Sequence, residues 1–121
     1  MAKVIICGYE KCDTCRKAKR WLEEHDVDYA WRPIVEEPPT KTELSVWIPR
    51  SRVPVRKWLN TSGQSYRAIG KANVDSATDA TLVKWLTEDG KLVKRPVLVT
   101  PDRVLVGFSP DAYSALLLGA E

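Results

Sequence analysis

The N-terminal third of the chain carries apolar segments whose spacing predicts a strand, a helix and a second strand. Residues 3–7 form a short apolar run, as in a buried strand. Residues 14–25 place apolar side chains at helical spacing, namely Cys15, Ala18, Trp21 and Leu22. A second strand is predicted over residues 27–33. A strand, a helix and a strand within about thirty residues indicate a right-handed crossover between two parallel strands.

The next segment carries helix signals that are separated by prolines. Thr40 and Glu43 have the spacing of a capping box and predict a helix that Pro49 ends. Pro54 suits the first turn of a second helix, predicted over residues 53–59, because its fixed φ matches that turn. Start and stop signals of this kind indicate a helical region, not a continuation of the sheet.

A turn and a third helix complete this helical region before the chain returns to strands. Residues 60–63 are rich in turn-forming residues, and residues 78–88 have an apolar face that predicts a helix. We therefore expect one domain spanning residues 1–121, with a helical insertion at about residues 40–90.

The C-terminal part predicts a hairpin followed by a last helix. Two apolar runs, residues 97–100 and 104–107, flank a Pro-Asp-Arg turn. Ser109 and Pro110 form a helix start before residues 111–118. The order β-α-β, helical insertion, β-β-α predicts an α/β protein with a four-stranded mixed sheet, which is the layout of the thioredoxin-like fold.

Composition narrows the class of protein further. The 121 residues are 44% hydrophobic and 29% charged, which is typical of a globular protein. The net charge of +3 is too small to predict nucleic-acid binding, so we expect no direct contact with DNA. No apolar run approaches the roughly 20 residues of a membrane span, and the N-terminus has no signal-like apolar region. We therefore expect a cytoplasmic protein.

Cys12 and Cys15 are predicted to carry out thiol redox chemistry. They form a C-x-x-C motif at the junction of the first strand and helix. Free backbone N–H groups and the helix dipole stabilise a thiolate at such a position. Cys12 precedes the first turn and is predicted to be the attacking thiol. Cys15 lies one turn further on the core-facing side, and is predicted to resolve a mixed disulfide on Cys12.

Two other interpretations of the cysteine pair stay open. A zinc site needs two further ligands, and the remaining candidates are Cys7 and His25, of which His25 lies at the far end of the helix. We therefore expect no metal. The pair can also be two inert core cysteines. Cys7 lies in the first apolar strand and is predicted to be a small buried side chain. His25 is predicted to be a cation at the helix end.

Two arginines are candidates for contact with the thiolate. Arg16 follows the pair directly and lies either beside Cys12 or on a solvated helix face. Arg95 precedes Pro96 in a loop that lies beside the cysteine pair in thioredoxin-like folds, where a cis proline exposes backbone groups to a bound partner. Arg95 can hold an anion or stabilise the Cys12 thiolate; the alternative is a surface charge.

Five blocks of sequence resemble the arsenate reductase-like (ArsC) family, in particular its C-x-x-C branch of Spx, MgsR and YffB-type proteins. They are CDTCRKAKRWLEEH (12–25), EPPT (37–40), NTSGQSYR (60–67), KRPV (94–97) and VGF (106–108). The resemblance implies a bacterial, cytoplasmic, thioredoxin-like protein with a helical insertion. It implies that Cys12 is the reactive cysteine and that Arg95 is the arginine of the family's Arg-Pro motif.

The chain departs from this family at two places that matter for arsenate. Glutaredoxin-coupled arsenate reductases carry arginines where this chain has Asn60 and where it reads Val-Gly-Phe at 106–108. An oxyanion needs several guanidinium or backbone donors to offset its charge. Cys15 also stands where that branch has no thiol, so this chain can resolve its own intermediate.

Three functions remain, in order of preference. The first is a thiol–disulfide oxidoreductase with a redox-active Cys12–Cys15 disulfide, no tightly bound cofactor, and glutathione, glutaredoxin or thioredoxin as reductant. The second is a redox-sensing regulator that binds RNA polymerase, at the C-terminal domain of its α subunit. The third is an arsenate reductase. In each case we expect a monomer, and whether the protein is an enzyme at all stays open.

Overall fold

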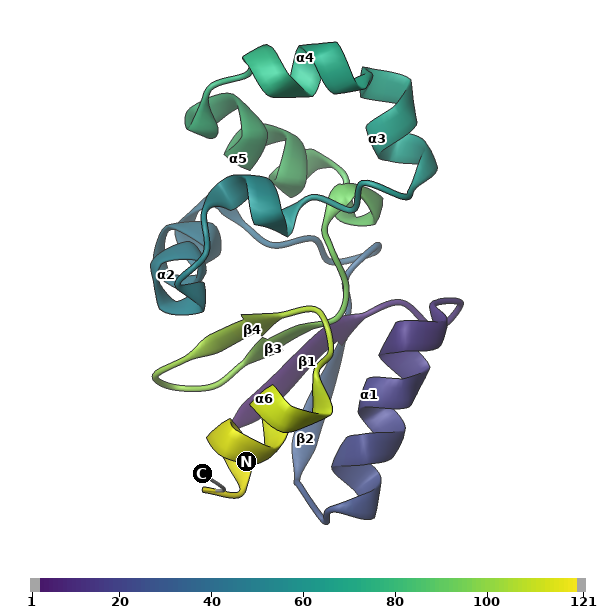
Figure 1. The fold of residues 1–121 in the computed structure, drawn as a ribbon, viewed down its shortest axis with the longest axis vertical. Coiled ribbons are helices and arrows are strands. Elements are labelled where there is room, and N and C mark those ends of the chain that lie inside the picture. The colour runs from purple at the N-terminus through teal and green to yellow at the C-terminus, as the bar shows by residue number, and fades with distance from the viewer. Residues whose placement is uncertain (1–2, 120–121) are drawn as a thin grey trace.

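The computed structural model describes residues 3–119, which form a four-stranded mixed sheet with helices on both faces (Figure 1). The strands are β1 (Val4–Gly8), β2 (Tyr29–Pro33), β3 (Val97–Val99) and β4 (Val104–Val106), in the spatial order β2-β1-β3-β4. β1 and β2 are parallel, whereas β1 with β3 and β3 with β4 are antiparallel. The prediction of a thioredoxin-like four-stranded mixed sheet is confirmed. The ends of the predicted domain lie outside the described residues, so its extent stays a prediction.

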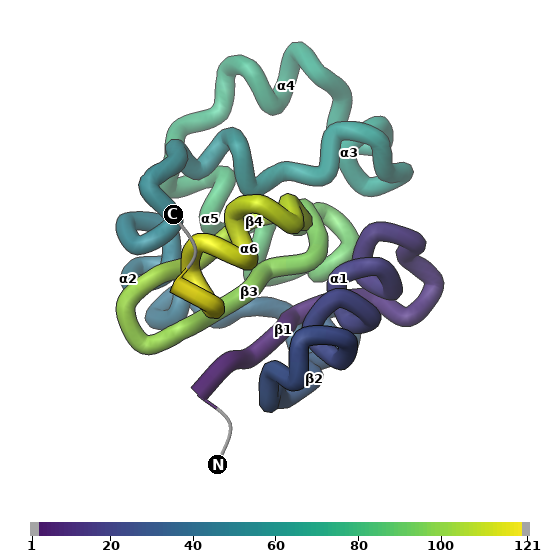
Figure 2. The backbone as a smooth tube through the Cα atoms, turned by 60° about the horizontal axis from the view of Figure 1, so that its bottom comes forward, coloured from purple at the N-terminus to yellow at the C-terminus, as the bar shows by residue number. Residues whose placement is uncertain are grey.

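One face of the sheet is covered by the first and last helices. α1 (Asp13–Glu24) and α6 (Pro110–Leu117) lie beside each other on this face (Figure 2). The side chains between the helices and the strands form one buried cluster: Val4, Ile6, Ala18, Leu22, Leu98 and Tyr113. This packing fixes the start of α1, and with it the cysteine motif, against the end of β1.

The helical region between β2 and β3 covers the other face and extends beyond the sheet (Figure 1). It comprises α2 (Lys41–Ser51), α3 (Gln64–Ile69), α4 (Lys71–Ser76), α5 (Asp79–Glu88) and the 3₁₀ turns Val55–Trp58 and Gly90–Leu92. Thr40 and Glu43 form the predicted capping box of α2. No helix within residues 3–119 is long and apolar enough to cross a membrane.

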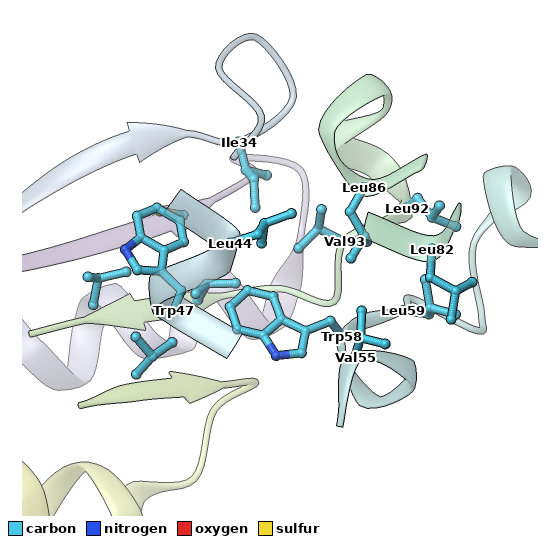
Figure 3. Close-up of a cluster of buried hydrophobic side chains, with 14 of the residues drawn as sticks. Ile34, Leu44, Trp47, Val55, Trp58, Leu59, Leu82, Leu86, Leu92 and Val93 are labelled. Carbon is cyan, nitrogen blue, oxygen red and sulfur yellow. The ribbon is translucent and has the colours of Figure 1, made fainter. Parts of the chain in front are cut away.

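A larger buried cluster joins this helical region to the sheet. Figure 3 shows Trp47 and Trp58 among the aliphatic side chains of the cluster. Trp58 is fully buried, and its indole N–H donates to Ser51 Oγ at 3.1 Å, so its polar atom is satisfied. The strand residues Cys7, Val97, Val99 and Val104 belong to the same cluster. The segments that flank Trp58 are therefore anchored on the sheet.

Three details of the helical region differ from prediction. α2 continues through Pro49 and ends at Ser51, and the following C-cap residue Arg52 has a left-handed φ of 61°. Pro49 is tolerated because it lies in the last turn on an exposed side, where water can bind the freed carbonyl. The helix predicted over residues 53–59 is only the 3₁₀ turn Val55–Trp58, since Leu59 leaves it to bridge Val93. α3 and α4 were not predicted.

Candidate functional site

Cys12 lies at the N-cap of α1, where the chain leaves the end of β1. Its backbone N–H donates to the Tyr9 carbonyl at 3.0 Å, which closes the loop between strand and helix. Its Sγ accepts from the backbone N–H of Cys15 at 3.4 Å. A thiol sulfur therefore occupies the position of a helix-capping acceptor, where the N–H groups and the helix dipole favour negative charge.

The surroundings of Cys12 favour its thiolate. Partial burial opposes ionisation, but hydrogen bonds from Cys15 and from Arg95, together with the charge of Arg95, outweigh it. The pKa of Cys12 is therefore lowered from its ordinary value. Of the two candidate arginines, Arg95 is the one that lowers the pKa of the Cys12 thiol, whereas Arg16 forms an exposed ion pair with Asp13.

Cys15 has the opposite environment. Its side chain is fully buried against the sheet side of α1, and its Sγ accepts from the Tyr9 backbone N–H at 3.5 Å. Burial, followed by the hydrogen bond with Cys12, raises the pKa of Cys15 to about 12. The described thiols Cys7, Cys12 and Cys15 are all unbonded. The motif thus combines one thiol that ionises readily with one that stays protonated.

Arg95 is held in place by two further contacts. Its guanidinium carbon lies 5.2 Å from the centre of the Tyr9 ring, and Nη1 donates to the Lys91 carbonyl at 3.3 Å. The Arg95–Pro96 peptide bond is cis. Tyr9 therefore contacts all three predicted site residues, two through its backbone and one through its ring. The sequence offered no signal for Tyr9, because stacking against a residue 86 positions later depends on the tertiary fold.

Cys12 opens into a cleft of about 520 Å³, which we call the thiol cleft. It lies between the start of α1, the loop before β3 and the start of α6. Its walls come from residues far apart in sequence: Cys12, Thr14, Asn60, Ser62, Lys94, Arg95, Leu105, Val106, Gly107, Phe108, Ser109, Ala112 and Tyr113. Lys94 was not predicted as a site residue, although it directly precedes the predicted Arg95.

A protein-family model supplies the classification. The model for the ArsC family matches residues 7–116, nearly the whole chain. The chain belongs to the ArsC family. The Bacillus subtilis protein YusI is 40% identical over 87% of this chain and 90% of its own length. The regulatory protein MgsR of the same organism is 29% identical over 89% of this chain and 85% of its own.

A solved structure of an ArsC family related protein from Bacteroides fragilis is similar throughout. It has a TM-score of 0.90 and 43% sequence identity, and the match covers 94% of this chain and 97% of that one. The family resemblance carried by the five sequence blocks is therefore confirmed, together with the thioredoxin-like fold. The roles assigned to Cys12, Cys15 and Arg95 stay predictions.

The two departures from the arsenate-reducing branch of the ArsC family both line the thiol cleft. Asn60 stands on one wall, where its amide donates to the Lys91 carbonyl at 3.4 Å. Gly107 stands on the other wall with a left-handed φ of 86°, and the Lys94 side chain packs over it. The cationic side chains of the cleft are therefore those of Lys94 and Arg95.

The remaining candidates lie away from the thiol cleft in this ArsC family member. Cys7 is buried in the core, as predicted, and burial raises its pKa to about 12. His25 follows the last turn of α1, where its ring stacks on Trp21 and Nδ1 lies 2.8 Å from the Trp21 carbonyl. Neither side chain lines the cleft around Cys12.

Proposed function

We propose that this protein is a cytoplasmic thiol–disulfide oxidoreductase in which Cys12 attacks and Cys15 resolves. The observation that supports the proposal most directly is the opposite shift of the two thiol pKa values within one turn of helix. A nucleophilic thiol must be accessible and must ionise more readily than an ordinary thiol; Cys12 lies at the edge of a cleft, and its pKa is lowered.

The proposed reaction is a two-step exchange. The Cys12 thiolate attacks one sulfur of a substrate disulfide, forms a mixed disulfide and releases the other sulfur as a thiolate, which takes up a proton. Cys15 then loses its proton and attacks Cys12 Sγ, so that the Cys12–Cys15 disulfide forms and the second substrate thiol leaves. Two electrons pass from the protein to the substrate.

A thiol reductant must restore the dithiol. Two glutathione molecules, or the dithiol of a glutaredoxin or thioredoxin, can supply the two electrons by the same exchange in reverse. Arg95 contributes by stabilising the Cys12 thiolate, both as attacking group and as leaving group, because its charge offsets the negative sulfur. No tightly bound cofactor takes part in these steps.

The trapping of the mixed disulfide tests the order of events. In the Cys15→Ser variant, the second step is blocked, so a stable adduct between Cys12 and a substrate thiol should accumulate and be visible by intact mass spectrometry. The matched Cys12→Ser variant should form no adduct. An adduct on Cys15 in the Cys12→Ser variant, at the rate of the parent protein, would contradict the assignment of Cys12 as nucleophile.

A second candidate function is a redox-switched regulator that binds RNA polymerase, at the C-terminal domain of its α subunit. It is favoured by the similarity to the regulatory protein MgsR over most of both chains. The Cys12–Cys15 disulfide would then report the redox state of the cell. Co-precipitation of that polymerase domain with the oxidised protein, and not with the reduced protein, would support this function. Absence of binding in both states would exclude it.

Arsenate reduction ranks third. The thiol cleft has Asn60 and the Val-Gly-Phe segment at 106–108 where the resemblance implies further arginines in glutaredoxin-coupled arsenate reductases, so fewer donors face a bound oxyanion. A coupled assay of arsenate-dependent NADPH consumption with glutaredoxin or thioredoxin tests it. Turnover comparable to that with a disulfide substrate would move this function to first place.

A further inference from the structure

A second hollow adjoins the thiol cleft. It has a volume of about 630 Å³ and is lined by Pro54, Arg56, Lys57, Leu59, Asn60, Thr61, Ser62 and Lys94. Asn60, Ser62 and Lys94 also line the thiol cleft, so the two hollows share a wall. We call the combined depression, from Cys12 to Lys57, the basic groove.

The charges that line the basic groove are all positive. They are those of Arg56, Lys57, Lys94 and Arg95, and neither hollow has an aspartate or glutamate in its lining. The whole chain is nearly balanced, with 19 basic and 16 acidic residues, so this separation of charge is local. The ion pairs within residues 3–119 are Arg16–Asp13, Arg32–Glu43 and Lys71–Asp75, which leaves Lys57 and Lys94 without a carboxylate partner.

Backbone pairing fixes the two sides of the basic groove together. Leu59 and Val93 form an antiparallel bridge. On either side of it, the Lys94 N–H donates to the Trp58 carbonyl and the Asn60 N–H donates to the Leu92 carbonyl, each at 2.7 Å. The fully buried Trp58 anchors this pairing in the core. Lys57 and Lys94 therefore project from a rigid frame, although 37 positions separate them in the sequence.

Arg56, which lines the second hollow, is held in place by two hydrogen bonds. Its two terminal nitrogens donate to the carbonyls of Val74 and Ala77, at 2.8 and 2.6 Å. Both acceptors are backbone carbonyls, so no carboxylate is paired with the guanidinium in these two bonds. Cationic side chains thus line both hollows of the groove: Lys94 and Arg95 in the thiol cleft, and Arg56, Lys57 and Lys94 in the second hollow.

We propose that the basic groove binds an acidic, extended polypeptide segment that flanks the disulfide attacked by Cys12. This inference rests on the proposed function and names its substrate class as acidic proteins. Carboxylates of the segment would meet Lys57 and Lys94, while the segment's cysteine reaches Cys12 at the other end. Nucleic acids also carry negative charge, but they have no disulfide to present to the thiol at which the groove ends.

Chromogenic peptides test the proposal. Each peptide carries one cysteine as a mixed disulfide with thionitrobenzoate, whose release on attack by Cys12 is measured by absorbance. Three peptides differ only in the flanking residues: glutamates, glutamines or lysines. The expected order of kcat/KM is glutamate, then glutamine, then lysine, and the difference should shrink as salt is added. Equal rates for the three peptides would overturn the proposal and leave the proposed function intact.

Single lysine variants locate the effect. Lys57→Gln and Lys94→Gln should each lower kcat/KM for the glutamate peptide by about two- to fivefold, the range of an exposed charge pair. Lys57 lies outside the thiol cleft, so Lys57→Gln should change kcat/KM for the glutamine peptide little. Lys84→Gln, at an exposed lysine of α5 outside the groove, is the matched control and should change neither. An equal loss in all three variants would attribute the effect to net charge and overturn the proposal.

Binding without chemistry separates this proposal from the proposed function. A fluorescent glutamate peptide with serine in place of cysteine should bind the parent protein more tightly than Lys57→Gln, as measured by anisotropy. If the peptide binds in this way but no thionitrobenzoate is released, the binding site for an acidic segment would be supported and the proposed oxidoreductase function would be contradicted. Stronger competition by a single-stranded oligonucleotide of equal charge than by unlabelled peptide would identify a nucleic-acid site and overturn the proposal.

Discussion

The interior of β1 and the junction between β1 and α1 place two cysteines, Cys7 and Cys12, in opposite environments only five residues apart. At Cys7, burial dominates and raises the thiol pKa to about 12, although the charge of Arg32 acts in the other direction. At Cys12, burial is partial, and hydrogen bonds from Cys15 and Arg95 outweigh it. The comparison shows that a nearby cation does not activate a buried thiol by itself.

Removal of each sulfur in turn gives the largest expected difference between the two regions. Cys12→Ser should lower disulfide exchange at least about 1,000-fold, because a serine hydroxyl is not ionised at neutral pH. Cys7→Ser should leave exchange within about twofold and cost about 1–3 kcal/mol of unfolding free energy, since it buries a hydroxyl in the core. Turnover assays and urea unfolding of both variants check this. Equal losses of activity in Cys12→Ser and Cys7→Ser would contradict the different roles assigned to the two cysteines.

Removal of the cation sharpens the comparison at the junction. Arg95→Ala should raise the pKa of Cys12 and slow its alkylation by iodoacetamide near pH 7 by about tenfold, the loss expected for one half-exposed charged hydrogen bond. Arg95→Lys keeps the positive charge but lacks the planar guanidinium, so its alkylation rate should lie between those of the parent protein and Arg95→Ala. An unchanged rate-pH profile in Arg95→Ala would mean that the helix N-terminus alone activates the thiol.

Alkaline unfolding probes the interior of β1. The Cys7 thiol is protonated in the folded state up to about pH 12, whereas in the unfolded chain it ionises near 9.0. The folded state therefore binds more protons between these values, and stability falls as the pH rises from about 9 to 12. Cys7→Ala should reduce the slope of unfolding free energy against pH in this window. If urea unfolding gives the same slope of unfolding free energy against pH for Cys7→Ala and for the parent protein, the raised pKa assigned to the buried Cys7 thiol would be contradicted.

The smallest expected effect concerns Tyr9. Tyr9→Leu removes the ring that faces Arg95 and should lower the Cys12 alkylation rate near pH 7 by about two- to fivefold, the range of a cation–π contact. Tyr9→Phe keeps the ring and should behave like the parent. The backbone bonds of Tyr9 to Cys12 and Cys15 persist in both variants, so a loss of equal size in both would assign the effect to the phenol oxygen.

The periodic parts of the fold were predictable from the sequence, and the irregular helical region was not. β1, α1 and the C-terminal hairpin have simple apolar patterns, so their positions were predicted within a few residues. α3 and α4 have six residues each, separated by Gly70 with a φ of 91°, which is too short for helical periodicity to stand out. The bridge between Leu59 and Val93, which ends the 3₁₀ turn, is a tertiary contact.

The same limit applies to the candidate site. Cys12 and Cys15 are visible from their spacing, and Arg95 from its place before Pro96, because these signals are local. Tyr9 and Lys94 join the site only through the packing of the loop before β3 against the start of α1. Contacts of that kind are set by the fold as a whole, so no window of sequence contains them.

The most direct test of the central claim is the pH dependence of alkylation, read separately at each cysteine by mass spectrometry. The predicted result is that Cys12 is alkylated with a pKa below the ordinary thiol value, while Cys15 and Cys7 resist alkylation far into the alkaline range. Alkylation of Cys15 at the same or a lower pH than Cys12 would contradict the account, because the nucleophile would then be the other thiol.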